Sequence, residues 1–414
     1  MKVVIMAGGK GTRIASVNSD VPKPMIPIDG KPILEYQINA LAAQGYCEII
    51  LIIGHLGHVI RDYFEDGSKW NIQISYIEEN TPLGTAGALF YLKEQIKDDF
   101  LLLNGDIIFD VDIRRFLAYH KAQGTMATIL THPNSHPYDS GIIVADNDGR
   151  ATNWLHKEDP RLWYRNRVNA GLHMLSPRIF SFFSDLQKKD LDRDILKPLI
   201  IQRELSVYDS PEYIKDMGTP DRYYSVIEDI HSGKVAAKNL ARKQKAIFLD
   251  RDGTINKYVG FLTNIDEFEL LDGVAEAIRQ INESGYLAIV ASNQPVIARG
   301  EVSPEELQEI HNKMETLLGQ KGAYLDAIFY CPHHPHKGYE GERPEYKIEC
   351  ECRKPKPGML LAAAEKYNID LTQSWMIGDS DNDIEAGQAA GCRVIKVNTN
   401  SSELSSAVKM ILNQ

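Results

Sequence analysis

Two short apolar runs, far apart in the chain, each end in a turn that is suited to phosphate. Residues 3–5 lead into a glycine-rich turn at 8–11, and residues 246–249 lead into an acidic turn that begins at Asp250. A glycine-rich turn after a strand binds phosphate through backbone N–H groups, whereas paired aspartates after a strand offer a nucleophile, a proton donor and magnesium ligands. We therefore expect two domains that run two consecutive reactions on one phosphorylated metabolite.

The composition agrees with this expectation and argues against other classes of protein. A chain of 414 residues is long enough for two or three domains, and 43% hydrophobic with 25% charged residues is ordinary for a globular protein. The net charge of −11, without a basic stripe, argues against a nucleic-acid or membrane partner. The first residues are typical of a strand and not of a signal peptide. We expect a cytoplasmic protein.

Short β-rich runs alternate with helical patterns in the first half of the chain. Strands are expected at 3–7, 49–53, 74–76, 100–103, 126–130 and 142–145. Helices are expected at 33–44, 86–93, 114–121 and 222–231. Such alternation is typical of a largely parallel sheet that helices cover. We predict an α/β protein with two Rossmann-like domains, the first with a mixed sheet and the second with a parallel sheet.

A polar stretch at 233–244 has few apolar side chains and indicates a linker, so the predicted domains are 1–232 and 245–414. A new strand–turn–helix cycle begins at residue 245. Further strands are expected at 288–291, 327–330, 375–377 and 394–397, and helices at 274–284, 304–318, 358–367 and 383–390.

The first glycine-rich turn is a candidate nucleotide site. Its glycines let the backbone approach a triphosphate closely, and nearby cations can neutralise the phosphates. The candidates for nucleotide binding are Gly8, Gly9, Gly11 and Thr12, and those for catalytic charge are Arg13 and Lys23, with Lys10 beside them. A glycine-rich turn alone is a weak signal, but the Pro-Lys-Pro-Met segment at 22–25 makes it stronger.

On these motifs, residues 1–230 resemble the sugar-1-phosphate nucleotidylyltransferases. The run Gly-Thr-Arg-Ile-Ala-Ser-Val at 11–17 is most similar to the D-glycero-α-D-manno-heptose 1-phosphate guanylyltransferases of that family, because hexose enzymes usually have Leu-x-Pro-Leu there. The resemblance implies a glycine loop near base and ribose, two Mg²⁺ carboxylates and contacts to the sugar phosphate. The matching residues are Gly84 and Thr85, then Asp106 and Asp216, and then Lys157, Asn169 and Gly171.

Simpler interpretations stay open for three of these residues. Asp106 could cap the following turn, Asp216 could be a surface acid, and Lys157 could be an ordinary exposed lysine. The family often has Glu-Lys-Pro where this chain has His156, Lys157 and Glu158. That departure leaves the recognition of the sugar hydroxyls open.

The second acidic turn is followed by three further parts of a phosphatase site. Asp250 would attack phosphorus, and Asp252 would protonate the leaving oxygen and later activate water. Neutral donors after one strand, then a cation, and then magnesium carboxylates after another strand follow in order. The candidates are Ser292 and Asn293, then Lys354, and then Asp379 and Asp383, with Asp250 and Asp252 completing the Mg²⁺ ligands. These four parts resemble the haloacid dehalogenase superfamily over about residues 245–398.

Three of the five cysteines lie close together in a segment rich in proline, glycine and charge. Three thiolates and one imidazole fit a closed tetrahedral zinc site, which would fix the loop at 331–352 and aim the residues after it at phosphate. The expected zinc ligands are Cys331, His333, Cys350 and Cys352, while His334 and His336 are expected to face solvent. The alternative is a set of free surface thiols.

This zinc pattern resembles the D-glycero-D-manno-heptose 1,7-bisphosphate phosphatases and the related histidinol-phosphate phosphatases. Arg299 and Arg353 are candidates for contact with the second phosphate or the sugar, although each could be a surface arginine. Pro295 stands where the family usually has serine, and Ser380 where lysine is common. Both departures bear on affinity and anomer preference.

Together the two resemblances imply a bifunctional enzyme of nucleotide-activated heptose synthesis, with Mg²⁺ in both sites. The second domain would remove the 7-phosphate from the bisphosphate, and the first would join the 1-phosphate to a nucleoside triphosphate, with GTP favoured. One alternative pairs a hexose-1-phosphate transferase with a histidinol-phosphate-like or other sugar-phosphate phosphatase. Another makes one domain a catalytically silent sensor. The sequence leaves open whether the chain forms a homo-oligomer.

Overall fold

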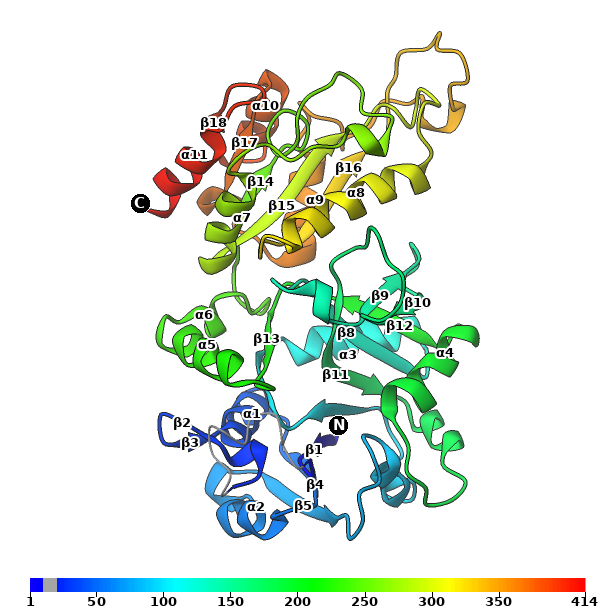
Figure 1. Ribbon diagram of the computed structural model, residues 1–414, viewed down its shortest axis with the longest axis vertical. Coiled ribbons are helices and arrows are strands. Elements are labelled where there is room, and N and C mark those ends of the chain that lie inside the picture. Colours follow the sequence, from blue (N-terminus) through cyan, green and yellow to red (C-terminus); the bar gives the residue numbers. More distant parts are fainter. Residues whose placement is uncertain (10–20, 414) are drawn as a thin grey trace. The chain divides into compact units, whose positions relative to one another are not determined.

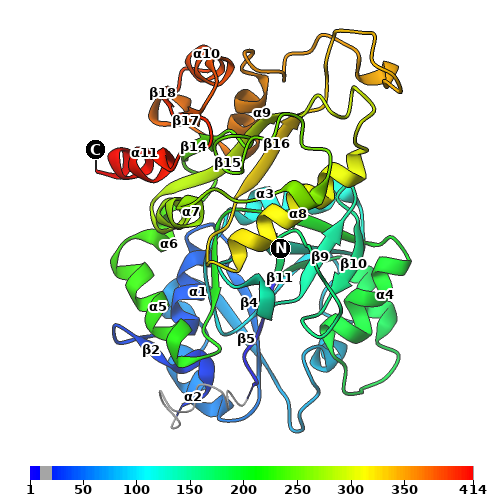
Figure 2. The same ribbon diagram turned by 45° about the horizontal axis from the view of Figure 1, so that its top comes forward.

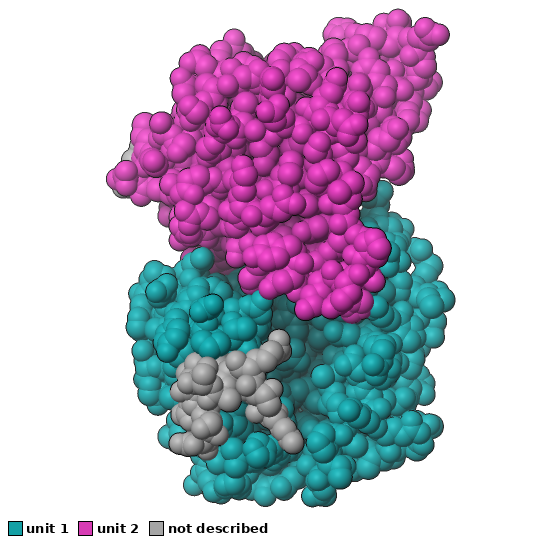
Figure 3. Space-filling model, viewed as in Figure 1, with its two compact units in different colours: residues 1–131, 143–154, 169–236 teal, residues 132–142, 155–168, 237–414 magenta. Residues whose placement is uncertain are grey.

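The computed structural model describes residues 1–9 and 21–413, which divide by contact into two compact units (Figures 1 and 3). The predicted turn residues Gly11, Thr12 and Arg13 lie outside the described residues. Unit 1 comprises Met1–Thr131, Ile143–Trp154 and Asn169–Ala236, and unit 2 comprises His132–Ile142, Leu155–Val168 and Ala237–Gln414.

Unit 1 is organised around a mixed sheet, as predicted. Its main path is β10 (Ala151–Leu155), β9 (Ile142–Ala145), β11 (Val168–Leu175), β6 (Phe100–Asn104), β1 (Val3–Met6), β4 (Glu48–Ile53) and β5 (Gln73–Glu78). β8 (Ala127–His132) pairs with β11 and with β12 (Leu205–Asp209). β1 is parallel to β4 and β6, whereas β11 runs antiparallel to β6. The carboxyl ends of β1, β4, β5 and β6 therefore meet at one edge, where α/β sheets bind ligands.

Helices cover both faces of this sheet because its central strands are apolar on both sides. The helices α1 (Ile33–Ala42), α2 (Gly57–Phe64) and α3 (Ile113–Gln123) bury Leu34, Ile60 and Phe116 in one core cluster. The other core cluster contains Leu89, from a helix at Gly87–Leu92, and Leu199, from α4 (Lys197–Ile201).

The helix predicted at 86–93 is a 3-10 helix in the structure, Gly87–Leu92. It begins where the chain passes very close to a distant segment. A Cβ atom added to Gly87 would lie 2.4 Å from the backbone oxygen of Gln187. This close approach, and not helical periodicity, shapes the segment.

The residues expected to form a linker are partly ordered and buried. α5 (Pro220–His231) is followed by α6 (Lys234–Ala237), and Leu240 is only 3% exposed. Lys238 forms a buried ion pair of 3.3 Å with Asp326 inside unit 2. The division by contact falls between residues 236 and 237.

Unit 2 contains a five-stranded, fully parallel sheet, as predicted. Its order is β16 (Ala327–Cys331), β15 (Tyr286–Asn293), β14 (Lys245–Leu249), β17 (Trp375–Gly378) and β18 (Arg393–Lys396). The order reverses direction at β14, so the carboxyl ends of β14, β15 and β17 surround a switch point of the sheet.

Helices again cover both faces. On one face α7 (Val274–Glu283), α8 (Pro304–Gly319) and α11 (Glu403–Leu412) pack against β14 and β15, and Figures 1 and 2 show α7 beside α11. α9 (Gly358–Tyr367) lies on the other face, and α10 (Asp381–Ala389) contacts β17 and β18. Within the described residues, none of these helices, nor any other, has the length and apolarity needed to cross a membrane.

Unit 2 also includes two segments from the first half of the chain. The segment Leu155–Val168 packs on α8, where Tyr164 and Thr316 exchange two hydrogen bonds of 2.9 and 3.1 Å. Arg167 forms an ion pair of 3.1 Å with Glu315, and both side chains are almost fully buried. These contacts explain why the segment groups with unit 2.

Two short ribbons complete the fold of unit 1. β2 (Pro27–Ile28) pairs with β3 (Lys31–Pro32), and β7 (Ile107–Asp110) pairs antiparallel with β13 (Tyr213–Asp216). The second ribbon aligns Asp216 with Ile107, which places Asp216 beside Asp106.

Candidate active sites and metal centre

Three acidic side chains meet at the carboxyl edge of the parallel sheet in unit 2. Asp250 follows β14, and Asp379 and Asp383 follow β17; one oxygen from each lies within 4.8 Å of the others. Gly253, with φ of +87°, permits this approach, because a Cβ atom there would lie 2.3 Å from Asp379 Oδ2. A cluster of carboxylate oxygens is the donor set that Mg²⁺ prefers.

Lys354 is the only cation that an ion pair joins to this cluster within the described ranges. Its ammonium lies 2.7 Å from Asp250 Oδ1 and 2.5 Å from Asp383 Oδ1. Burial raises the pKa of Asp250 to about 7, while Lys354 acts in the opposite direction. Burial would lower the pKa of Lys354, but Asp250 and Asp383 outweigh it and raise that pKa. One positive charge thus faces three carboxyl groups, and a divalent cation would compensate the excess.

The end of β15 holds Lys354 in place. Asn293 Nδ2 donates to the backbone oxygen of Lys354, and the Lys354 backbone N–H donates to Asn293 Oδ1, both at 3.0 Å. Ser292 Oγ accepts a hydrogen bond of 2.9 Å from Gln294 Nε2. Asn293 therefore positions the predicted cation, and Ser292 lies one residue away on the strand end.

The carboxylate of Asp252, which the sequence predicts as a fourth Mg²⁺ ligand, does not belong to the acidic cluster of Asp250, Asp379 and Asp383. Arg251 donates to both of its oxygens at 2.9 and 2.8 Å, Asn256 donates at 3.0 Å and Gln294 at 2.8 Å. Burial acts to raise the pKa of Asp252, but Arg251 and the hydrogen bonds outweigh it and keep that pKa low. Neither Arg251 nor Asn256 was expected from the sequence to have a role, although both lie in or next to the recognised motif.

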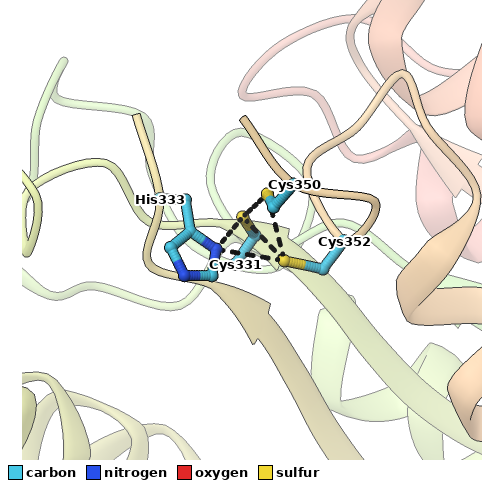
Figure 4. A group of neighbouring side chains, drawn as sticks. All are labelled: Cys331, His333, Cys350 and Cys352. Carbon is cyan, nitrogen blue, oxygen red and sulfur yellow. Dashed lines mark hydrogen bonds between the residues drawn. The ribbon is translucent and has the colours of Figure 1, made fainter. Parts of the chain in front are cut away.

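The four predicted zinc ligands come together in unit 2 (Figure 4). Cys331 ends β16, and the loop that follows brings back Cys350 and Cys352. The separations between sulfur and sulfur or nitrogen run from 3.2 to 3.7 Å. The edges of a tetrahedron with metal–sulfur bonds of ~2.3 Å measure ~3.8 Å, so a zinc ion fits this set with a small expansion.

The two candidate substrate arginines of unit 2 have different surroundings. Arg353 Nη1 donates to the backbone oxygen of His333 at 3.1 Å, which ties it to the cysteine cluster. The Arg299 guanidinium lies between two rings, 4.0 Å from the centre of Phe261 and 4.3 Å from that of Tyr339, and pairs with Glu301 at 2.7 Å. The side chain of Arg299 is thus fixed by two aromatic rings and one carboxylate.

In unit 1 the two predicted magnesium aspartates lie on neighbouring backbone segments. The backbone N–H of Met217, next to Asp216, donates to the backbone oxygen of Asp106 at 2.9 Å. Lys23 forms a close ion pair with Asp106, and its charge also lowers the pKa of Asp216. Lys23 thus places a positive charge beside Asp106 and close enough to act on Asp216.

Arg222 is a functional candidate that the sequence motifs did not indicate. Its Nη1 lies 3.0 and 2.8 Å from the two oxygens of Asp216. Burial acts to raise the pKa of Asp216, and Arg222 together with Lys23 outweighs it and lowers that pKa. Thr219 caps α5, and its side chain accepts from the backbone N–H of Arg222 at 3.4 Å, so Arg222 lies in the first turn of the helix that follows Asp216.

The remaining candidates of unit 1 lie near the carboxyl edge of its sheet or on loops. A Cβ atom at Gly8 would lie 2.7 Å from Glu79 Oε2, and one at Gly171 would lie 2.8 Å from Asn104 Nδ2. Asn169 Oδ1 accepts from the backbone N–H of Gly171 at 2.9 Å. Gly9 has an exposed position after β1.

Gly84 and Thr85 pack against a later segment of the chain. A Cβ atom at Gly84, with φ of +81°, would lie 2.4 Å from the backbone oxygen of Lys189. Thr85 Oγ1 accepts from the backbone N–H of Leu191 at 2.8 Å. Lys157, which groups with unit 2, is 59% exposed and lies 3.8 Å from Glu158.

Comparison with known families matches the N-terminal and the C-terminal part of the chain to different families. Residues 2–233 match the nucleotidyl transferase family. Residues 351–411 match a family described as HAD-hydrolase-like. The first match covers more than half of the chain.

Several known proteins are similar to one part of this chain. The D-glycero-beta-D-manno-heptose-1,7-bisphosphate 7-phosphatase of Pasteurella multocida is 46% identical over 36% of this chain and 77% of its own length. The D,D-heptose 1,7-bisphosphate phosphatase of B. bronchiseptica, crystallised with magnesium and phosphate, is 33% identical over 41% of this chain and 99% of its own, with a TM-score of 0.37. HddC of Yersinia pseudotuberculosis is 28% identical over 55% of this chain and 99% of its own, with a TM-score of 0.49. The chain therefore belongs to the nucleotidyl transferase family through residues 2–233, and to the family of these heptose bisphosphate phosphatases through its C-terminal part.

Proposed function

We propose that the chain makes a nucleotide-activated heptose in two steps. The C-terminal unit would hydrolyse the 7-phosphate of D-glycero-D-manno-heptose 1,7-bisphosphate, and the N-terminal unit would join the resulting 1-phosphate to the nucleotidyl group of GTP. The observation that carries the proposal is the cluster of Asp250, Asp379, Asp383 and Lys354 at the switch point of a parallel sheet. A phosphatase that spares the 1-phosphate supplies the substrate of the transferase.

In the phosphatase step an oxygen of Asp250 would attack phosphorus, and the bond between phosphorus and the sugar oxygen would break. Asp252 would give its proton to that leaving oxygen; a phosphoryl dianion beside it favours the protonated form. Asp252 would then take a proton from water, which attacks the aspartyl-phosphate and frees Asp250. Lys354 would stabilise charge on the transferred group. Mg²⁺, held by Asp250, Asp379 and Asp383, would supply further charge neutralisation when bound.

In the transferase step a phosphate oxygen of the sugar 1-phosphate would attack the α-phosphorus of the nucleotide, and pyrophosphate would leave. Asp106 and Asp216 would hold Mg²⁺, which neutralises the phosphates when bound. Lys23 and Arg13 would neutralise the phosphates, and the turn at Gly8 would approach the triphosphate through its backbone. Lys157, Asn169 and Gly171 are proposed to contact the sugar phosphate.

Zinc is proposed as a structural ion at Cys331, His333, Cys350 and Cys352. The distances within this set support a closed site. The hydrogen bond from Arg353 to the backbone oxygen of His333 would fix Arg353, and with it the backbone that leads into Lys354. Five free cysteines suit the reducing cytoplasm, where we place both reactions.

One incubation tests the proposal. The full chain with Mg²⁺ receives the α or the β anomer of the heptose bisphosphate together with GTP, ATP, CTP and UTP, and mass spectrometry follows the products. We expect loss of the 7-phosphate and formation of GDP-heptose. Both anomers are included because the curated relatives are named for β, whereas the resembled guanylyltransferases use α. Release of the 1-phosphate would contradict the pairing of the two steps.

Paired variants assign each step to its unit. Asp250→Asn should abolish phosphate release and leave the transferase active when the 1-phosphate is supplied. Asp106→Asn should do the reverse. The exposed residues Asp266 and Asp98 provide matched controls, Asp266→Asn in unit 2 and Asp98→Asn in unit 1. Unchanged pyrophosphate release in Asp106→Asn would refute the transferase metal site.

A further inference from the structure

The acid of the phosphatase site is held by a chain of buried side chains that extends to α8. Arg251 contacts Asp252 through Nε at 3.2 Å and through Nη2 at 2.9 and 2.8 Å. The Arg251 side chain is 1% exposed. Its remaining nitrogen, Nη1, lies 3.2 Å from Nε2 of His311, which is also buried.

His311 is a neutral acceptor in this contact. Burial lowers its pKa to about 3, and the charge of Arg251 acts in the same direction. A neutral imidazole with its proton on Nδ1 offers the Nε2 lone pair to the guanidinium. The groups around the ring are Arg251, Asp252, Arg165 and the ring of Tyr330, which is 5.5 Å away.

The helix that carries His311 is well anchored. Ser303 and Glu306 form a capping box at its start, and Lys313 donates to the backbone oxygen of Ile265 at 2.8 Å. Gln294 also holds Asp252: its Nε2 donates to Asp252 Oδ2 and to Ser292 Oγ, a predicted phosphoryl donor. Asp252 is thus fixed by Gln294 toward Ser292 and by Arg251 toward His311 on α8.

We propose that His311 and Arg251 are positioning residues that aim the carboxyl group of Asp252 at the oxygen leaving from the sugar. This inference rests on the proposed phosphatase function. Loss of the acceptor at His311 leaves a buried N–H of Arg251 without a partner, and the guanidinium then shifts to regain one. A shift of Arg251 turns the Asp252 carboxyl group away from the leaving oxygen, while the Asp250 nucleophile stays in place.

The test compares two kinds of phosphate ester in the full chain with Mg²⁺. Glycerol phosphate and the heptose bisphosphate release an alkoxide that needs a proton, whereas p-nitrophenyl phosphate releases a stable phenolate that does not. We expect His311→Leu to lower the rate of the first step, release of the alcohol in a single turnover, at least ~10-fold on the alkyl esters, a part of the ~10²–10⁴-fold that a general acid contributes. The first-turnover release of p-nitrophenolate should stay within about twofold, because Asp252 acts on that ester only in the later attack of water on the aspartyl-phosphate.

Two further variants make the result decisive. His311→Gln keeps an acceptor and should restore most of the alkyl rate, whereas Gln308→Leu, an exposed change on the same helix, should alter neither rate. Arg251→Lys should also lower the rate on the alkyl esters selectively, and it replaces His311→Leu in the test if that variant does not fold. Equal losses on both esters, or none on either, would overturn the proposal. A wild-type chain that hydrolyses neither ester would instead refute the phosphatase function itself.

Discussion

Lys354 donates a hydrogen bond of 2.7 Å to Asp250, although the two residues are 104 positions apart in the chain. The contact forms because β14 delivers Asp250 to the sheet edge while Asn293, at the end of β15, holds the backbone of Lys354. Each partner thus depends on a different strand end. The charge state of the predicted nucleophile, Asp250, therefore depends on the predicted cation, Lys354.

Removal of Lys354 should therefore disable the phosphatase without unfolding the unit. In Lys354→Met the buried acids lose their cation, and the charge that develops on the phosphoryl group loses a donor. We expect phosphate release to fall at least ~100-fold, as for the loss of one oxyanion donor, with GDP-heptose formation from supplied 1-phosphate unchanged. Lys356→Met, which removes an exposed lysine paired with Glu351, is the control. A loss below about tenfold would contradict the assigned role.

The cysteine cluster predicts a dependence of unit 2 on zinc. Cys350→Ser should lower the zinc content from one ion per chain, measured by atomic absorption, and should lower the Tm of unit 2. The reason is that binding of a structural zinc ion adds directly to folding stability. Cys47→Ser changes an exposed cysteine outside the cluster and should alter neither quantity. A wild-type chain without zinc would argue for free thiols, and full zinc content in Cys350→Ser would exclude Cys350 as a ligand.

His173 on β11 predicts a pH dependence of the stability of unit 1. Burial lowers its pKa to about 4, and neither ring nitrogen has a hydrogen-bond partner among the described residues. An unfolded histidine titrates near 6.5, so below that pH the unfolded chain binds the proton more readily and stability falls until about pH 4.

The non-titrating variant His173→Leu should lose ~2 kcal/mol less than wild type between pH 7.5 and pH 5, because a tenfold difference in proton affinity between the folded and unfolded chain is worth ~1.4 kcal/mol. Urea unfolding of the full chain at the two pH values measures the difference. His58→Leu, at an exposed position in the same unit, should follow wild type. Parallel pH profiles for wild type and His173→Leu would rule out this role.

The sequence predicted those parts of the sites that lie at strand ends. Apolar runs indicate strands, and the carboxyl ends of parallel strands share an edge, so Asp250, Ser292 and Asp379 were expected together. The family assignment and the two types of sheet are confirmed. The individual residue roles remain predictions.

Residues that reach the sites from helices could not be found in the same way. His311 falls on the apolar stripe of α8, between Ile310 and Met314, where periodicity indicates only burial. Arg222 lies in the first turn of α5, where no motif indicates that its side chain reaches Asp216. The segment at 155–168 has no periodic apolar face, so nothing in its pattern indicates that Arg167 packs on α8.

That packing leads to a prediction about stability. Arg167 and Glu315 form a buried ion pair, and Arg167 also donates to the backbone oxygen of Asp326 at 3.1 Å. Glu315→Gln removes one charge and leaves the other buried, which should destabilise unit 2 by ~3–5 kcal/mol in urea unfolding of the full chain. The exposed Glu309→Gln on the same helix is the control.

The double variant Arg167→Met with Glu315→Leu removes both charges and should recover most of the lost stability, because well-packed apolar residues can replace a buried pair without a large cost. A single-variant loss below about 1 kcal/mol would mean that solvent reaches the pair and that Leu155–Val168 is held on α8 by other contacts.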